Sequence, residues 1–344
     1  MDVRSSPKQM SSPSKPPGQG SPKEQWIVSV AYLTDPTAVG DSVEVLDQDV
    51  VSLGAEDFAA KRVSVPFAEC CLLYQWTNAK LRTQTRIHPA FETVTILGPN
   101  ARGSIDGVSL SPHSMIAASP GASAEIIIDG GYESIALMVP PQVLEKHLAV
   151  RRGAADFLVT DSVAVWHPAL EESRALFKLG AQIANAAEKT PAVFNDSYSA
   201  RYGAQVEFMD SLLSTIESCG AREPDDADRK GKSYSQIVKT CEEYTMNSEG
   251  RRPYVSELCE AAHVSERTLQ YAFRDIMGMS PVTYLHRLRL HRARNELRSA
   301  RKGSTTVTEI AMNWGFWHFG AFSKAYKNCF GEVPSKTLRQ GTTD

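Results

Sequence analysis

Residues 307–335 read VTEIAMNWGFWHFGAFSKAYKNCFGEVPS, and they predict two short helices joined by a tight turn. Thr306 stands before this segment and Glu309 follows three residues later, which is a capping box that starts the first helix. Gly315 provides a turn residue that tolerates a positive φ. The second helix carries a buried stripe with an aromatic residue at every fourth position: Phe322, Tyr326, Phe330. This pattern is typical of a helix-turn-helix unit, whose second helix can enter a DNA major groove, and helical hairpins that bind nothing share it.

The same pattern occurs once earlier in the chain. Leu258 precedes Ile310 by 52 residues and Leu269 precedes Phe322 by 53, so the second turn is one residue longer than the first. Ser265 is a good N-cap for the second helix of the earlier copy. Repetition within one chain indicates that the motif is a structural unit rather than a chance match.

A longer helix is predicted between the two units, with Ser280 as its N-cap, Pro281 at its first position and an end near Gly303. A helix of roughly 17–20 residues spans about 25–30 Å, and successive major-groove faces lie about 34 Å apart. One chain could therefore lay both recognition helices along one side of a duplex. This segment holds one acid, Glu296, and many basic residues: Arg287, Arg289, Arg292, Arg294, Arg298, Arg301, Lys302. Some of these side chains are expected to face phosphates, and others to form a solvated helix face.

A long and specific signature runs through residues 233–340. It consists of these segments: Arg289-Leu290, Ala293, Leu297, Ile310-Ala311, Gly315-Phe316, Phe322-Ser323-Lys324, Tyr326-Lys327, Phe330-Gly331, Pro334-Ser335. On these residues the segment resembles the DNA-binding domain of the AraC/XylS family of transcription regulators. Residues 265–270 and 314–320 are similar to the ethanolamine-operon regulator and its relatives. Three positions depart from the family pattern and affect only local packing: Tyr254, Cys259, Leu338.

The resemblance implies a transcription regulator with particular partners. They are double-stranded promoter DNA, RNA polymerase, an unidentified small-molecule effector and a second copy of the chain. No cofactor is expected. The last third of the chain is expected to bind DNA, and the first part to sense the effector.

The two predicted recognition helices differ in character. The first carries polar side chains on the face opposite its apolar residues, and Arg and Gln can bond guanine and adenine bidentately. The resemblance implies base contacts by four residues of the first unit: Arg267, Thr268, Gln270 and Tyr271. The base contacts expected for the second unit are His318, Phe319, Gly320, Ala321 and Lys324. Contacts with the DNA backbone are expected from Ser265, Arg274, Arg287, Arg294, Thr306 and Lys327. Small residues read few base edges, so the first unit is expected to carry most direct base discrimination, and the second unit more backbone positioning and shape readout. The alternative for Phe319 is a place in the core.

Composition describes an ordinary globular chain of 344 residues, 42% apolar and 22% charged, which is long enough for two domains. The net charge of −3 hides an asymmetry, because residues 233–344 hold 16 Lys+Arg against 11 Asp+Glu (+5) and the remainder holds 21 against 29 (−8). A basic part on an acidic partner fits polyanion binding by one part only. No apolar run approaches about 18 residues and no signal-peptide core is seen, so a cytoplasmic protein without membrane segments is expected. The six cysteines show no zinc-like spacing and are expected to be reduced.

The predicted fold class is α+β, with an N-terminal β-rich, cupin-like barrel and helical hairpin, and a C-terminal all-α domain with two helix-turn-helix units. Residues 1–25 are rich in Pro, Ser and Lys and are predicted to be a disordered tail. Residues 26–218 are predicted to form the effector-binding and dimerisation domain. Residues 219–233 are polar and charged and are predicted to be a linker, and residues 234–340 to be the DNA-binding domain.

Within the N-terminal part, short apolar or alternating runs separated by Gly, Pro, Asn and Asp predict a small barrel or sandwich up to about residue 140. A short helix is predicted at 141–148. Two amphipathic helices follow at about 168–188 and 196–218, and they form a helical hairpin. This hairpin either packs on its own barrel or also contributes to a dimer interface.

Candidate ligand residues in this part are few. Tyr74, Trp76 and Arg86 either line an effector pocket or are core aromatics and a surface charge. His88 and Glu92 come nearest to a metal site, but no His-x-His cluster is present and no metal is expected. An enzyme is therefore not expected. The competing interpretations are a metal-dependent cupin-like enzyme, or a protein-binding module, fused to the DNA-binding domain.

Overall fold

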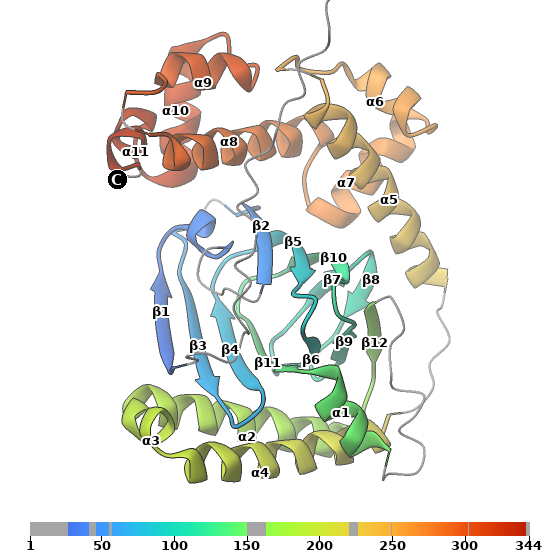
Figure 1. Ribbon diagram of the computed structural model, residues 1–344. Coiled ribbons are helices and arrows are strands. Elements are labelled where there is room, and N and C mark those ends of the chain that lie inside the picture. Colours follow the sequence, from blue (N-terminus) through green and yellow to red (C-terminus); the bar gives the residue numbers. More distant parts are fainter. Residues whose placement is uncertain are drawn as a thin grey trace, which may run out of the picture.

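Strands fill the first part of the chain and helices the last, in a computed structural model that describes residues 27–40, 46–54, 57–149, 163–219, 226–248, 250–301 and 303–341 (Figure 1). The tail predicted for residues 1–25 lies outside the described residues. The predicted α+β class is confirmed, with antiparallel sheets followed by a helical region.

Two antiparallel sheets make up the N-terminal part. The larger sheet has the strand order β1 (Ser29–Leu33), β3 (Ala60–Pro66), β4 (Cys71–Thr77), β11 (Tyr132–Val139), β6 (Glu92–Leu97), β9 (Met115–Ala118), β12 (Val163–Trp166). The smaller sheet has the order β2 (Leu46–Ser52), β5 (Leu81–Ile87), β10 (Ser123–Ile128), β7 (Gly103–Ile105), β8 (Val108–Leu110). A short 3-10 helix, η1 (Pro36–Ala38), follows β1.

The prediction of a closed barrel is wrong. Among the described residues no strand pairing joins the larger sheet to the smaller one, so two open sheets face each other. Short strands with regular turns occur in both barrels and sandwiches. Closure depends on hydrogen bonds between strands that are distant in sequence, and the local pattern does not encode it.

The helical hairpin covers the outer face of the larger sheet (Figure 1). It consists of α2 (Leu170–Lys189) and α4 (Tyr198–Glu217), joined by the short α3 (Pro191–Asp196), and α1 (Pro141–Leu148) lies near one end. Because the other face of this sheet meets the smaller sheet, its central strands are buried on both sides, and β4 begins with the apolar run CLLY. The packing of the hairpin on its own sheet is thus observed.

The C-terminal part is helical. Its elements are α5 (Asp226–Met246), α6 (Val255–Ala261), α7 (Glu266–Met277), α8 (Pro281–Ser299), α9 (Val307–Asn313), α10 (Phe319–Phe330), α11 (Pro334–Gln340). Helix α5 begins inside the segment predicted to be a linker, so residues 226–233 are helical. No helix in the described parts of the chain is long and apolar enough to cross a membrane.

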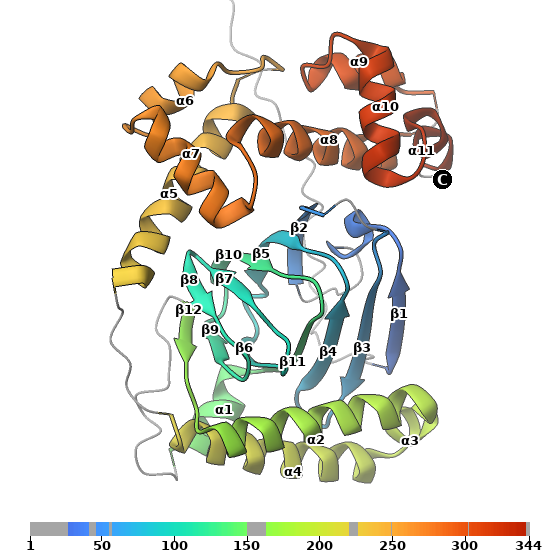
Figure 2. The same ribbon diagram turned by 180° about the vertical axis from the view of Figure 1, so that it is seen from behind.

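The two parts are in direct contact. Helix α8 crosses over the ends of the strands, with α7 and α10 toward its opposite ends (Figures 1 and 2). Val51 and Ile127 of the smaller sheet, together with Leu53 just after β2, belong to one buried apolar cluster with residues of α5, α7 and α8. At a second place the backbones touch, because a Cβ added at Gly107 would lie 2.1 Å from the carbonyl oxygen of Gly231 in α5. The sheet domain is therefore packed against the helices rather than loosely tethered to them.

Candidate nucleic-acid interface

The first helix-turn-helix unit comprises α6 and α7. Leu258, Leu269 and Phe273 are buried between them, as the repeat pattern predicted. At the start of α7 the Ser265 hydroxyl accepts a hydrogen bond from the Thr268 N–H at 3.2 Å. The turn before it places His263 at φ 52°. This left-handed backbone conformation is unfavourable for any residue that carries a Cβ.

The second unit comprises α9 and α10. The Thr306 hydroxyl accepts from the Glu309 N–H at 3.1 Å, and the Glu309 carboxylate accepts from the Thr306 N–H at 2.8 Å, so the predicted capping box is present. Gly315 lies at φ 74°, and a Cβ there would be 2.2 Å from the carbonyl oxygen of Gly250. Phe322 and Tyr326 are buried within the unit. Glycine is thus required at this turn both for its conformation and for its close approach to the backbone.

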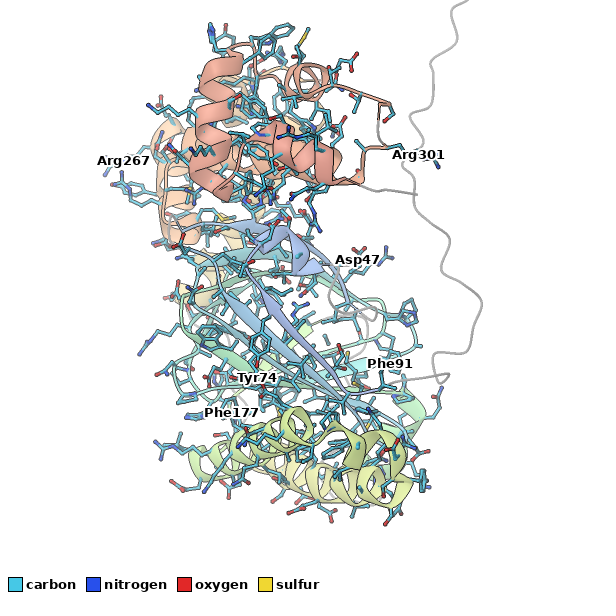
Figure 3. All side chains as sticks on the ribbon, turned by 90° about the vertical axis from the view of Figure 1, so that its left-hand side faces the viewer. Asp47, Tyr74, Phe91, Phe177, Arg267 and Arg301 are labelled. Atoms are coloured by element: carbon cyan, nitrogen blue, oxygen red, sulfur yellow. The ribbon has the colours of Figure 1, made fainter. Side chains whose placement is uncertain are left out.

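The polar face of α7 is open to solvent. Arg267 projects from the surface (Figure 3), and its guanidinium lies 5.5 Å from the ring centroid of Tyr271, which is 47% exposed. Arg274 is also exposed, while Thr268 and Gln270 are half-buried. This face presents two guanidinium groups, an amide and a phenol, which are groups able to bond base edges and phosphates.

The start of α10 presents a different surface. Phe319 is 40% exposed, so it is not a core residue, and Gly320, Ala321 and Lys324 are exposed beside it. His318 is the N-cap and makes no side-chain capping bond. Trp317, which the sequence pattern did not mark as a contact residue, is 65% exposed in the turn before this helix. The longer second turn, in which Trp317 lies, is the sequence feature that could have indicated its exposure.

The residues expected at the DNA backbone fall into two groups. Four lie on the solvent side of the helical domain or at helix starts: Ser265, Arg274, Thr306, Lys327. The other two, Arg287 and Arg294, lie at the boundary with the sheet domain. Arg287 Nη1 donates to the carbonyl oxygens of Ser52 at 3.2 Å and Gly54 at 3.0 Å. Arg294 is 5% exposed and pairs with Asp35 and Glu332, so in this arrangement its guanidinium is not available to a phosphate.

Two adjoining cavities lie between the sheets of the N-terminal part. Including the solvent space at their openings, one measures about 580 Å³ and the other about 510 Å³, and both are bordered by Gln48, Gln75, Ile126 and Tyr132. Most of the remaining lining of the larger cavity is aliphatic or Thr. Such a space suits a small, mainly apolar molecule that carries a hydrogen-bonding group.

The three residues considered as effector ligands lie in different places. Trp76 borders the smaller cavity. Tyr74 packs against the apolar cluster under the helical hairpin, and burial raises its pKa to about 12 (Figure 3). Arg86 is exposed on β5. The structure therefore does not bring the three together. The Gln48 and Gln75 amides at the cavities could not be predicted from the sequence, because a polar residue in an alternating strand resembles a surface residue.

His88 and Glu92 do not form a metal site with a third ligand. His88 Nδ1 accepts from the Ala90 N–H at 3.1 Å. Burial, followed by the charge of Glu145, raises the pKa of Glu92 to about 7. Among the described residues no three His, Cys, Asp or Glu side chains are grouped to hold a metal ion.

Comparison with known proteins identifies similar sequences and structures. A helix-turn-helix domain family matches residues 258–340. A probable thc operon regulatory protein of Rhodococcus erythropolis is 38% identical over 104 residues, which are 30% of this chain and 31% of that protein. The XylDLEGF operon transcriptional activator 2 of Pseudomonas putida is 31% identical over 132 residues, which are 37% of this chain and 77% of that protein. A solved structure of a probable AraC family transcriptional regulator from Rhodopseudomonas palustris is 34% identical, with a TM-score of 0.29, over 31% of this chain and 99% of that one.

Two helix-turn-helix units on one connecting helix, beside a separate sheet domain, define a class of DNA-binding protein. The sequence similarity gives the family: the chain belongs to the AraC/XylS family of transcriptional regulators. The chain spans about 31% of the length of the first curated relatives it matches. Family membership therefore rests on the helical domain, as the signature in residues 233–340 predicted.

Proposed function

We propose that this protein is a sequence-specific DNA-binding regulator of transcription that binds promoter DNA through α7 and α10. The open polar face of α7, with Arg267 and Tyr271 exposed at its start, carries this proposal. Arg267, Thr268, Gln270 and Tyr271 contact base edges. The start of α10, with Trp317 added to the expected set, contributes apolar contacts and shape readout.

The regulator acts as an activator in the cytoplasm and works with RNA polymerase. The support is the name of the Pseudomonas putida relative, which is a transcriptional activator. The proposal assigns no catalytic role to the chain.

Selection of binding sites from random DNA tests this function. The full chain is mixed with a random duplex pool at moderate salt, which suppresses non-specific binding, and bound sequences are enriched and read. The expected consensus has two parts separated by about 10 base pairs, one for each recognition helix. No consensus, or one that fits a single groove, contradicts the proposal.

The N-terminal domain binds a small-molecule effector in the cavities that Gln48 and Gln75 border. The aliphatic lining and the Gln75 amide support a ligand with an apolar body and a polar group, because the Gln48 amide already pairs with Arg62 and Thr85. The similarity of residues 265–270 and 314–320 to the ethanolamine-operon regulator lies in the DNA-binding part, so it does not select this ligand. A ligand that binds only the folded chain raises its melting temperature, and Gln75→Leu should remove that increase.

The chain also acts as a homodimer through its helical hairpin. Helix α4 exposes Tyr198, Tyr202 and Val206 at intervals of four residues, and the two tyrosine rings stack with centroids 6.1 Å apart. Three exposed apolar residues on one helix face suit a second helix of the same kind. Sedimentation of Tyr202→Glu tests this, because a buried carboxylate should dissociate the dimer.

A further inference from the structure

Polar side chains line the larger cavity on the inner face of the larger sheet. Thr93 and Thr95 of β6 point to the same face, because side chains alternate along a strand, and both border this cavity. Gln75 of β4 borders it as well. Across the intervening β11, Gln75 pairs with Ser134 and Thr93 pairs with Met138, so the two ends lie about 13 Å apart along the strand at about 3.4 Å per residue. The cavity is therefore elongated, with Gln75 toward one end and Thr93 toward the other.

The Thr93 hydroxyl is buried without a partner. Thr93 is 6% exposed, and its Oγ1 makes no hydrogen bond with any residue that the structure describes. Thr85, which lines the same cavity, differs, because its hydroxyl donates to Thr83 at 3.2 Å and accepts from the Gln48 amide at 3.0 Å. A buried hydroxyl without a hydrogen bond destabilises the folded chain. A bound molecule that bonds with Thr93 Oγ1 removes this cost.

Two more polar groups face the cavity. The Thr95 hydroxyl and the Gln75 amide are half-buried, and neither makes a side-chain hydrogen bond within the described part of the chain. On β11 the small Ala136, which pairs with Thr95, lies between the positions of Ser134 and Met138. The larger cavity thus offers hydrogen-bonding groups toward both ends and an apolar surface between them.

The larger cavity is also uncharged. None of the described residues that line it carries a charge, and its walls are mainly aliphatic, with Ile87, Ile116 and Val163 among them. Arg62 borders the smaller cavity, where its guanidinium donates to the Val39 carbonyl oxygen at 2.6 Å and to Gln48 Oε1. A carboxylate or an ammonium group in the larger cavity would lose its hydration without gaining an opposite charge, which is costly.

We infer that the larger cavity binds a neutral, elongated aliphatic molecule whose hydroxyl or carbonyl oxygen is held by Thr93 and Thr95. A hydroxyl side chain donates to an oxygen of either kind and also accepts from an alcohol. The Gln75 amide, toward the other end, holds a second polar group where the molecule has one. This inference rests on the proposed effector site and names the chemical class of its ligand.

A matched set of probes tests the class of ligand: 1-hexanol, 2-hexanone, hexanoate and hexylammonium. They share a chain length and differ in charge, because the last two are ionised at neutral pH. Binding to the full chain is measured by isothermal titration calorimetry and by the melting temperature. The variants are Thr93→Val, which replaces the hydroxyl with a methyl group, and Thr93→Ser, which keeps the hydroxyl. The matched control is Thr190→Val, at an exposed position at the end of α2.

The alcohol or the ketone should raise the melting temperature and bind about tenfold more tightly than either ion. Thr93→Val should weaken binding of that neutral probe about 5–10-fold, which corresponds to one hydrogen bond. Thr93→Ser should weaken it by less than about threefold, and Thr190→Val by less than about twofold. Without a probe, Thr93→Val should have a higher urea midpoint than the wild type, because it removes an unpaired buried hydroxyl.

Binding of hexanoate or hexylammonium as tight as that of the neutral probes overturns the neutral class but keeps an effector site in the cavity. Binding of no probe overturns this inference together with that site. Unchanged affinity in Thr93→Val also overturns the inference. So does a lower urea midpoint, or an unfolded chain by circular dichroism, since the hydroxyl then has a partner within the chain. The DNA-binding function fails separately, when the wild-type chain selects no consensus.

Discussion

The two helix-turn-helix units share a pattern but differ in what completes their cores. The buried cluster of the first unit includes Val51, Leu53 and Ile127 from the sheet domain. The cluster of the second unit contains only residues of α8 to α11 and the turns between them. The unit with the long polar recognition side chains is therefore the one whose core is shared with the N-terminal domain. Any motion between the domains acts first on the half that we propose reads bases.

Their turns differ as well. The first turn places His263 in the left-handed region, where the second turn has Gly315. The second turn is also one residue longer and contacts the backbone at Gly250. The second turn is thus fixed by a close backbone approach to the loop before α6, whereas the first turn carries a side chain in a left-handed conformation.

The largest expected effect comes from the glycine of the second turn. Gly315→Ala adds a Cβ that would lie 2.2 Å from the Gly250 carbonyl oxygen, in addition to a left-handed backbone that costs about 1–2 kcal/mol. A total loss of about 3–4 kcal/mol in unfolding free energy is expected in urea titrations. The control is Gly331→Ala, which has φ 73° but no atom within 4 Å of the added Cβ, and it should lose only the backbone cost. Equal losses would show that the close approach is unimportant.

The second effect separates the recognition helices. Arg267→Ala should weaken binding to the selected site by about 1–3 kcal/mol and relax the sequence preference at one position. Lys324→Ala should weaken binding to all sequences alike and lower the salt slope by about 1. Competition with singly substituted duplexes measures both. A sharper loss of specificity in Lys324→Ala than in Arg267→Ala would reverse the roles of the two units.

The third effect is on pH dependence at the domain boundary. His291 of α8 is buried, and its Nε2 accepts from the Ser52 N–H at 3.3 Å. Burial first, and then the positive charge of Arg287, lowers its pKa to about 3 from 6.5. The unfolded chain therefore binds this proton more tightly, so the stabilisation is complete above pH 6.5 and is lost as the pH falls from 6.5 towards 3.

The wild type and His291→Gln are compared by urea unfolding between pH 7 and 4. The stability of the wild type should fall more steeply than that of the variant over this range. Other charged or titratable groups near His291 remain in both proteins: Asp35, Arg287, Arg292, Arg294, Cys329. Burial raises the pKa of Glu242 to about 7, which opposes the loss in both proteins. Parallel pH curves would exclude His291 as the source.

The smallest effect concerns the turn of the first unit. His263→Gly removes left-handed strain of about 1–2 kcal/mol and adds unfolded-state entropy worth about 0.5–1 kcal/mol. The net result should be a gain of up to about 1.5 kcal/mol, measured as a higher urea midpoint. His318→Gly, at φ −105°, relieves no such strain and should not stabilise the chain. A loss in His263→Gly would mean that the imidazole makes a contact worth more than the strain.

Local sequence patterns predicted the helical domain well. Caps, a turn glycine and aromatic residues at intervals of four specify α9 and α10, and the repeat specifies α6 and α7. The environment of the α8 arginines could not be predicted in this way. Arg292 and Arg294 read as a basic helix face, and their partners Asp49 and Asp35 lie more than 200 residues earlier. The two-sheet arrangement and the lining of the cavities depend on similarly distant pairings.

The contact between Gly107 and Gly231 has a consequence for engineering hybrid regulators. Each residue lies against the carbonyl oxygen of the other, at 2.1 and 2.0 Å from the added Cβ, so the spacing between turn and helix is set by bare main chain. A side chain at either position would clash with this main chain and increase the distance between the sheet domain and α5. A chimera that joins this DNA-binding half to a foreign sensor must therefore carry a glycine in the foreign turn. Without it, α5 cannot pack against the sensor domain at this distance.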